Sequence, residues 1–347
     1  MEPAQFFAAS RVAIVAGKGG VGKTTVSAVL ARAAARSGLT TLIIEIEGKS
    51  GMAAMFGHEP LAYEEIVLSA AGPDRAEVRA RTLTPDDALL EYMRDNGLSR
   101  LSKRLVSSGA LDMVATAVPG IKDILVLAKV KQLERSAEAG ADGSPDLLII
   151  DAPAAGHAIT FLQSARGMVD AVKVGPLNRQ AAEVLALLTD PRRCQVLLVT
   201  LPEETPVNEL VETAFNLEDK VGVSLGPVVV NGLYDPIDGL GTDPAVAATA
   251  ADATLRKGEA ASLAEAAEFR THRMALQAAQ LERLAEVLPL PQLRLPFVFD
   301  ADLSEDDVER LATHLLAGIA ALPDGPAEPD AAAPADEATG TGTGTAS

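Results

Sequence analysis

The chain has 347 residues, 48% of them hydrophobic, which is enough for one large domain or two small ones with a buried core. Aromatic residues make up only 3% and tryptophan is absent, so a base-stacking nucleic-acid platform is not expected. The net charge of −18 argues against broad binding to nucleic-acid backbones or anionic lipid.

The single cysteine, Cys194, excludes an intramolecular disulfide and a zinc or iron–sulfur site built on several cysteines. Neither a basic signal segment nor an apolar run of about 18 residues is visible. We therefore expect a cytoplasmic protein without stable membrane insertion, in which Cys194 is a buried structural residue.

Runs of Val, Ile and Leu alternate with longer helical patterns along the chain. Because these runs are continuous, they predict strands covered on both faces, and the intervening helices predict βαβ units. The expected fold is α/β, a doubly wound, mostly parallel sheet. The expected strands are 11–16, 40–46, 146–151, 194–201, 227–231 and a weaker 290–296, with a long helix at 22–37.

Two stretches exceed what a minimal α/β domain needs. Residues 85–138 have apolar side chains at helical spacing and predict an inserted helical subdomain, and the Ala-rich residues 243–287 predict a second helical region. We expect a single domain over residues 1–322 with these two insertions. Residues 323–347 are rich in Ala, Pro, Gly and Thr and predict a disordered tail.

Residues 17–24, Gly-Lys-Gly-Gly-Val-Gly-Lys-Thr, match the pattern G-x-x-x-x-G-K-[ST] between an expected strand and helix. In this phosphate loop the glycines let backbone N–H groups turn toward phosphate oxygens, and the helix dipole adds positive potential. We expect Lys23 to neutralise the β- and γ-phosphates of ATP and Thr24 to ligate Mg²⁺. The expected nucleotide-binding residues of this segment are Gly17, Gly19, Gly20, Val21, Gly22, Lys23, Thr24 and Thr25.

Lys18 adds a second lysine to the phosphate loop, and it is either a solvated charge or a functional group. The run KGGVGKTT resembles the deviant Walker A class, a superfamily with arsenite-pump, nitrogenase-iron-protein and chromosome-partitioning branches. The resemblance implies that Lys18 reaches phosphate oxygens across a nucleotide-sandwich dimer. The partner in that dimer would be a second copy of this chain or a paralogous ATPase subunit.

Residues 151–157, Asp-Ala-Pro-Ala-Ala-Gly-His, follow the expected strand 146–151. An Asp at this strand end suits a carboxylate that orders the water shell of Mg²⁺. The run resembles the switch II motif D-T-A-P-T-G-H of the arsenite-pump ATPase (ArsA) and of the targeting ATPases of the GET pathway. The resemblance implies a catalytic and metal role for Asp151 and a switch role for Gly156 and His157.

Three further positions follow from this resemblance. The family's switch I Asp, which positions the attacking water, aligns with Glu47. Either Glu47 replaces it with a longer reach, or ATP hydrolysis is slow because the water is displaced. The third alternative is that Glu47 is an exposed acid at the end of a strand. Asn231 aligns with a residue that contacts adenine, although a turn-forming Asn before Gly232 would look the same. Residues 119–123 resemble the family's P-G-x-D-E run.

The resemblance implies an ATP-hydrolysing dimeric switch of the ArsA/GET type with ATP and Mg²⁺ as cofactors. It would handle a hydrophobic protein client, with the helical insertion as a candidate client groove. One cysteine cannot supply the several thiolates of a metalloid site, so arsenite transport is not expected. The alternatives are a weakly hydrolysing regulatory subunit paired with a paralogous ATPase, a ParA/MinD-type positioning ATPase, and an ATP-dependent ligase.

Overall fold

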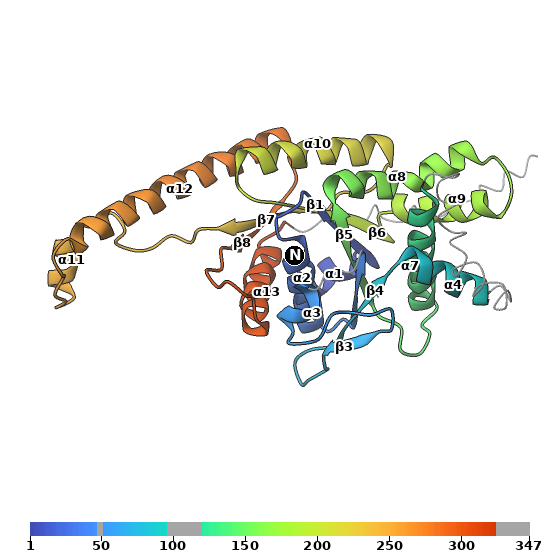
Figure 1. The fold of residues 1–347 in the computed structure, drawn as a ribbon, viewed down its shortest axis with the longest axis horizontal. Helices are drawn as coiled ribbons and strands as arrows, with labels where there is room; N and C mark the ends of the chain where they lie inside the picture. Colours follow the sequence, from blue (N-terminus) through green and yellow to red (C-terminus); the bar gives the residue numbers. More distant parts are fainter. Residues whose placement is uncertain (47–50, 96–119, 324–347) are drawn as a thin grey trace, which may run out of the picture.

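The computed structural model describes residues 1–46, 51–95 and 120–323. Its centre is an eight-stranded sheet in the order β3-β4-β2-β5-β1-β6-β7-β8 (Figure 1). All neighbouring strands run parallel except the edge pair β3–β4. The strands are β1 Val12–Gly17, β2 Thr41–Ile46, β3 Ile66–Ser69, β4 Val78–Leu83, β5 Leu147–Ala154, β6 Cys194–Thr200, β7 Val228–Leu233 and β8 Gln292–Pro296.

Helices cover both faces of this sheet, and the alternation of side chains along β1 shows how the core divides. Ile14 faces the helices α7 to α10, whereas Ala13 and Val15 face α2 and α13. This two-sided burial confirms the doubly wound α/β fold. The helices are α1 Pro3–Ala8, α2 Lys23–Arg36, α3 Gly51–Met55, α4 Pro85–Asp95, α7 Ile121–Glu138, α8 Ala155–Ala171, α9 Pro176–Thr189, α10 Glu204–Lys220, α11 Pro244–Ala250, α12 Glu259–Val287 and α13 Glu305–Ala320.

The strands expected from apolar runs agree with the structure, but β3 and β4 were not anticipated. The β4 sequence VRARTL carries two arginines, a pattern that argues against a buried strand. The Arg81 guanidinium lies over the Tyr63 ring at 4.2 Å and contacts Glu65 at 3.5 Å, so its charge is accommodated inside the fold. Tertiary partners therefore override the composition of this strand.

In the described part of the expected insertion 85–138 lie the helices α4 and α7, and α9 packs against α7 (Figure 1). Residues 96–119 between α4 and α7, including Pro119 of the segment 119–123, lie outside the described residues. None of the helices in the described ranges combines the length and the apolar character needed to span a bilayer.

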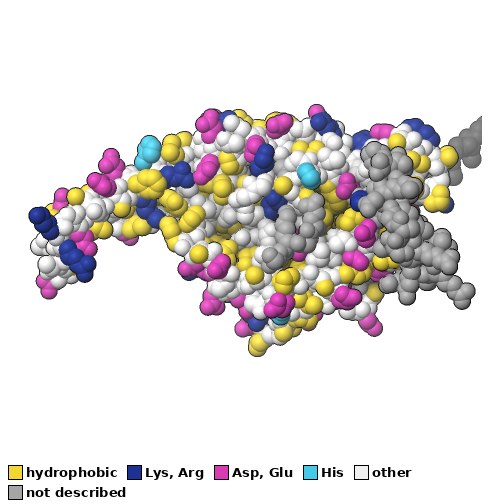
Figure 2. Space-filling view, viewed as in Figure 1, with side chains coloured by type: hydrophobic (Ala, Val, Ile, Leu, Met, Phe, Trp, Pro, Cys, Tyr) yellow, Lys and Arg dark blue, Asp and Glu magenta, His cyan; other side chains and the backbone are white. Residues whose placement is uncertain are grey.

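The second helical region, 243–287, forms an arm that projects from the body in Figure 1 and consists of α11 and α12. Only Gln277 and Leu284 of α12 are buried. Gln277 fixes the root of the arm, since its side chain accepts from the Tyr234 N–H at 2.9 Å and donates to the Gly232 carbonyl at 3.0 Å. Hydrophobic side chains gather where the arm meets the body (Figure 2). The ring of exposed Phe299 lies 5.8 Å from the Arg270 guanidinium of α12 and contacts the ring of exposed Phe297.

A cluster of charges lies where the parallel strands begin. We call this end of the sheet the amino edge, and the end where the strands finish the carboxyl edge. Glu134 of α7 is fully buried and accepts hydrogen bonds from Arg11, which precedes β1, and from Arg193, which precedes β6. Burial alone would raise the pKa of Glu134, but the hydrogen bonds from Arg193 and Arg11 outweigh it and lower the pKa. We call Arg11, Glu134 and Arg193 the amino-edge clamp.

Candidate functional site

The phosphate loop, residues 17–24, leaves the carboxyl end of β1 and enters α2 at the centre of the sheet. Its first residue must be glycine, because a Cβ on Gly17 would lie 2.4 Å from the backbone carbonyl oxygen of Val199 on β6. Gly19 and Gly20 face open space, so the outer part of the loop leaves room for a ligand at the N-terminus of α2.

The end of the loop packs against β7 through Asn231. Gly22 has φ +88°, and a Cβ there would lie 2.3 Å from the Asn231 amide nitrogen. The same nitrogen donates to the Val21 carbonyl at 3.0 Å. Asn231 therefore lies against the loop and supports its backbone. The sequence did not predict this contact, and the expected contact of Asn231 with adenine stays a prediction.

Lys23 is the first residue of α2, and its side chain curls back into the loop. Its ammonium group donates to the Lys18 carbonyl at 3.0 Å, and the residue is only 6% exposed. A buried ammonium that donates to a backbone carbonyl of the loop can take an anionic oxygen as a stronger partner. This cradle fits the phosphates of a nucleotide.

Thr24, the residue directly after Lys23, contacts Asp151 of β5. The Thr24 hydroxyl donates to Asp151 Oδ2 at 2.7 Å, and Asp151 lies near the carboxyl end of β5 with an exposure of 1%. Ser27, one turn along α2, donates to Asp151 Oδ1 at 3.4 Å and was not singled out in the sequence. A hydroxyl beside a buried carboxylate is a suitable pair of oxygen ligands for Mg²⁺. Among the described residues, no cluster of three or more His, Cys, Asp or Glu side chains could by itself hold a metal ion.

A second buried carboxylate, Glu45, stands in register with Asp151 on the neighbouring strand β2. It accepts a hydrogen bond from the Thr82 hydroxyl of β4 at 3.2 Å. Sequence reasoning concentrated on Glu47 and missed Glu45, although an acid inside the apolar run TLIIEI was a visible signal. Glu47 lies outside the described residues.

Lys18 is half exposed, and its ammonium group forms an ion pair with Glu209 of α10 at 2.6 Å. The resemblance gave Lys18 a role but gave no partner within its own chain, so Glu209 is a new feature. In this arrangement the Lys18 ammonium is directed toward α10 of the same chain.

The expected switch II segment spans the end of β5 and the start of α8. Gly156 and His157 are exposed in the first turn of α8, and Thr25 is partly buried in the first turn of α2. The structure brings Lys23, Thr24, Asp151 and Asn231 together around one loop. Gly156 and His157 lie on the helix that follows Asp151, and their switch role stays a prediction.

The phosphate loop and Asp151 both fall within residues 10–182, which match the model of the anion-transporting ATPase family. ATPase BagA of Mycobacterium tuberculosis is 32% identical over 224 residues, covering 64% of this chain and 64% of that protein. The chain thus spans just under two thirds of the length of the mycobacterial relatives it matches.

Two more distant relatives extend the comparison. A putative arsenical pump-driving ATPase of Halobacterium salinarum is 26% identical over 322 residues, covering 88% of this chain and 44% of that protein. The ATPase get3 of Pyrenophora tritici-repentis is 26% identical over 226 residues, covering 65% of this chain and 60% of that protein. Relatives of both the arsenical-pump and GET types therefore match the same chain.

Proposed function

The chain belongs to the ArsA/GET-type family of anion-transporting ATPases, and from this premise we propose that it binds ATP with Mg²⁺ and hydrolyses the terminal phosphate bond. The observation that carries the proposal is the buried Lys23 ammonium inside the loop, next to the Thr24–Asp151 pair. Together they offer one cationic and two oxygen groups at the N-terminus of α2.

Each residue has a defined task in this proposal. Bound Mg²⁺·ATP would supply a polarised γ-phosphate to an attacking water. Lys23 would exchange its bond to the Lys18 carbonyl for phosphate oxygens, and so offset their charge. The Thr24 hydroxyl would turn from Asp151 toward the metal, while Asp151 would hold metal-bound water. Glu47 is the candidate for positioning the attacking water, and buried Glu45 lies two residues before it in the sequence.

We also propose that the chain works as a dimer, with itself or with a paralogous subunit. Lys18 would reach across to the partner's nucleotide, and for this it would have to leave Glu209. Because an exposed ion pair of this kind is worth little in water, its release would cost about 1 kcal/mol or less.

The proposed cargo is a hydrophobic protein segment, not arsenite. The arsenical-pump relatives are named for a metalloid function, but this chain has one cysteine, and that cysteine is buried. Burial raises the pKa of the Cys194 thiol to about 12, so it stays protonated and is a poor metalloid ligand. The GET-type relatives support the targeting alternative.

The test measures ATP binding by calorimetry and phosphate release by the purified chain. We expect Lys23→Ala to weaken ATP binding by about 100-fold or more, because it removes a buried charge-assisted contact. The control is Lys220→Ala at the exposed end of α10, which should bind like the wild type. Equal binding by wild type and Lys23→Ala would overturn the proposal. Tight binding without phosphate release would favour the weakly hydrolysing regulatory subunit.

A further inference from the structure

A cavity of about 510 Å³ lies on the outer face of α7, between α4 and α9, and it has no role in the proposed ATPase reaction. Its volume falls within the range of small-molecule sites. The phosphate loop contributes no residue to its lining. Any ligand here would therefore occupy a site separate from the nucleotide.

The charge of this cavity is opposite to that of the chain as a whole. Among the described residues that line it, the ionisable side chains are Lys129, Lys131 and Arg135, with Glu183 as the one acid. In the whole sequence, acids outnumber basic residues by 48 to 30. A basic lining in an acidic protein favours an anion at this place.

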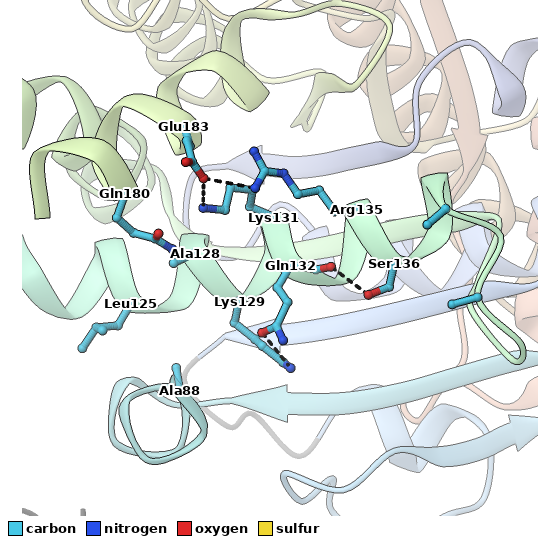
Figure 3. A pocket seen from close by; sticks show the side chains of 12 residues that line it. Ala88, Leu125, Ala128, Lys129, Lys131, Gln132, Arg135, Ser136, Gln180 and Glu183 are labelled. Atoms are coloured by element: carbon cyan, nitrogen blue, oxygen red, sulfur yellow. Dashed lines mark hydrogen bonds and ion pairs between the residues drawn. The ribbon is translucent and has the colours of Figure 1, made fainter. Parts of the chain in front are cut away.

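Two cationic side chains of the cavity share one carboxylate as their ion-pair partner. Lys131 and Arg135 both contact the same oxygen of Glu183, at 2.7 and 3.1 Å, so two positive charges share one negative charge (Figure 3). The hydrogen bond from Lys131 lowers the pKa of Glu183, which keeps that carboxylate ionised. On the other side of α7, Lys129 pairs with Glu91 at 2.7 Å. One positive charge is left over at Glu183.

Most of the other residues that line the cavity are apolar. The apolar side chains of the lining are Leu125 and Ala128 of α7, Ala88 of α4, and Ala139 and Ala141 directly after α7. Gln132 and Gln180 add neutral hydrogen-bonding groups. A ligand that complements this lining has an apolar body and one negatively charged end, because Lys131 and Arg135 together exceed the charge of Glu183 by one positive charge.

We propose that this cavity binds a small amphipathic monoanion, with its carboxylate on Lys131 and Arg135 and its apolar chain along Leu125, Ala128 and Ala88. Glu183 marks the carboxylate position, because its own oxygen already bridges the two cations. The ligand carboxylate would join or displace Glu183 there. Glu183 then acts as a competitor that sets the affinity of the site.

The test uses octanoate as the probe, titrated calorimetrically into the full-length chain, with acetate and 1-octanol as the head-only and chain-only controls. We expect octanoate to bind at least about tenfold more tightly than either control, because both parts of the probe are needed. Equal binding of octanol would mean that the cavity recognises only apolar surface, and it would overturn the proposal. No measurable octanoate binding to the wild type would overturn it as well.

Variants at the site are expected to act in opposite directions. Lys131→Met keeps the apolar stem and should weaken octanoate binding by about tenfold or more, and Arg135→Met should weaken it in the same direction. Glu183→Gln removes the competing charge and should strengthen binding severalfold. Weaker binding by Glu183→Gln, or unchanged binding by both cation variants, would contradict the proposal.

Two matched controls complete the design. Lys220→Met changes an exposed lysine on α10 and should leave octanoate binding unchanged. Lys23→Ala should also leave octanoate binding unchanged while it abolishes ATP binding, which separates this inference from the proposed function. If Lys131→Met fails to fold, the exposed Arg135 and the half-buried Glu183 still decide the outcome.

Discussion

The two edges of the central sheet hold their buried charges in different ways. At the carboxyl edge, Lys23 donates to a backbone carbonyl within a glycine loop, and Asp151 accepts from the hydroxyls of Thr24 and Ser27. At the amino edge, Glu134 accepts four hydrogen bonds from Arg11 and Arg193. The contacts named at the carboxyl edge are hydrogen bonds to neutral groups, whereas those at the amino edge join a carboxylate to two guanidinium groups.

This difference separates binding from stability. Neutral partners can be traded for phosphate or a metal ion at small cost, so the carboxyl edge is suited to ligands. A buried carboxylate between two arginines cannot lose a partner cheaply, so the amino edge is suited to holding α7, β1 and β6 together. Substitutions at the two edges should therefore give separable phenotypes.

The largest expected effect on stability is at the amino-edge clamp. Glu134→Gln leaves two arginines facing a neutral group, and we expect it to lower the free energy of unfolding by about 3 kcal/mol. Urea unfolding would measure this loss, and ATP affinity should stay within about twofold of the wild type. Glu138→Gln is the matched control, because exposed Glu138 also contacts Arg11, at 3.0 Å, yet should change stability by less than about 0.5 kcal/mol.

At the carboxyl edge, Gly17→Ala and Gly19→Ala should separate fold from function. The new Cβ at Gly17 meets the Val199 carbonyl, so we expect a loss of about 2 kcal/mol in unfolding free energy without any ligand. The Cβ at Gly19 meets nothing within 4 Å, so stability should be unchanged while ATP binding weakens. A loss of stability in Gly19→Ala equal to that in Gly17→Ala would show that the outer loop is packed, contrary to this comparison.

Acid should weaken the amino edge through Glu134. Because the folded protein holds the pKa of Glu134 below its ordinary value of 4.5, the clamp contributes fully above that pH and is lost as the pH falls through the lowered pKa. The difference in unfolding free energy between wild type and Glu134→Gln should therefore shrink below about pH 4.5. A difference that stays constant down to pH 3 would mean that Glu134 is not the titrating group.

The smallest effect concerns Cys194, which begins β6 beside Arg193. Its thiol is buried and its pKa is raised to about 12, so a thiol reagent at pH 8 should label it only when the protein opens. Labelling should be complete in denaturant and faster in Glu134→Gln than in the wild type. Rapid labelling of the native wild type would show that the amino edge opens locally, without global unfolding.

The sequence revealed the carboxyl edge much better than the amino edge. Lys23 and Thr24 are neighbours in a known pattern, and Asp151 and Asn231 end apolar runs, so the parallel sheet brings them to one place. Glu134 lies 123 residues after Arg11 and 59 residues before Arg193, and no local sequence pattern links the three. Glu209 and Ser27 were missed for the same reason, since only the packing of helices on the sheet reveals them.

The arm, α11 and α12, has a consequence for how movement at the site is transmitted. Asn231 touches the phosphate loop, and Gln277 grips the backbone at Gly232 and Tyr234 directly after it. Residues 259–276 extend from that grip for about 27 Å at 1.5 Å per residue. A rotation of about 10° at Gln277 would displace the far end of α12 by about 5 Å. A small movement beside the phosphate loop would therefore become a larger displacement at the end of the arm.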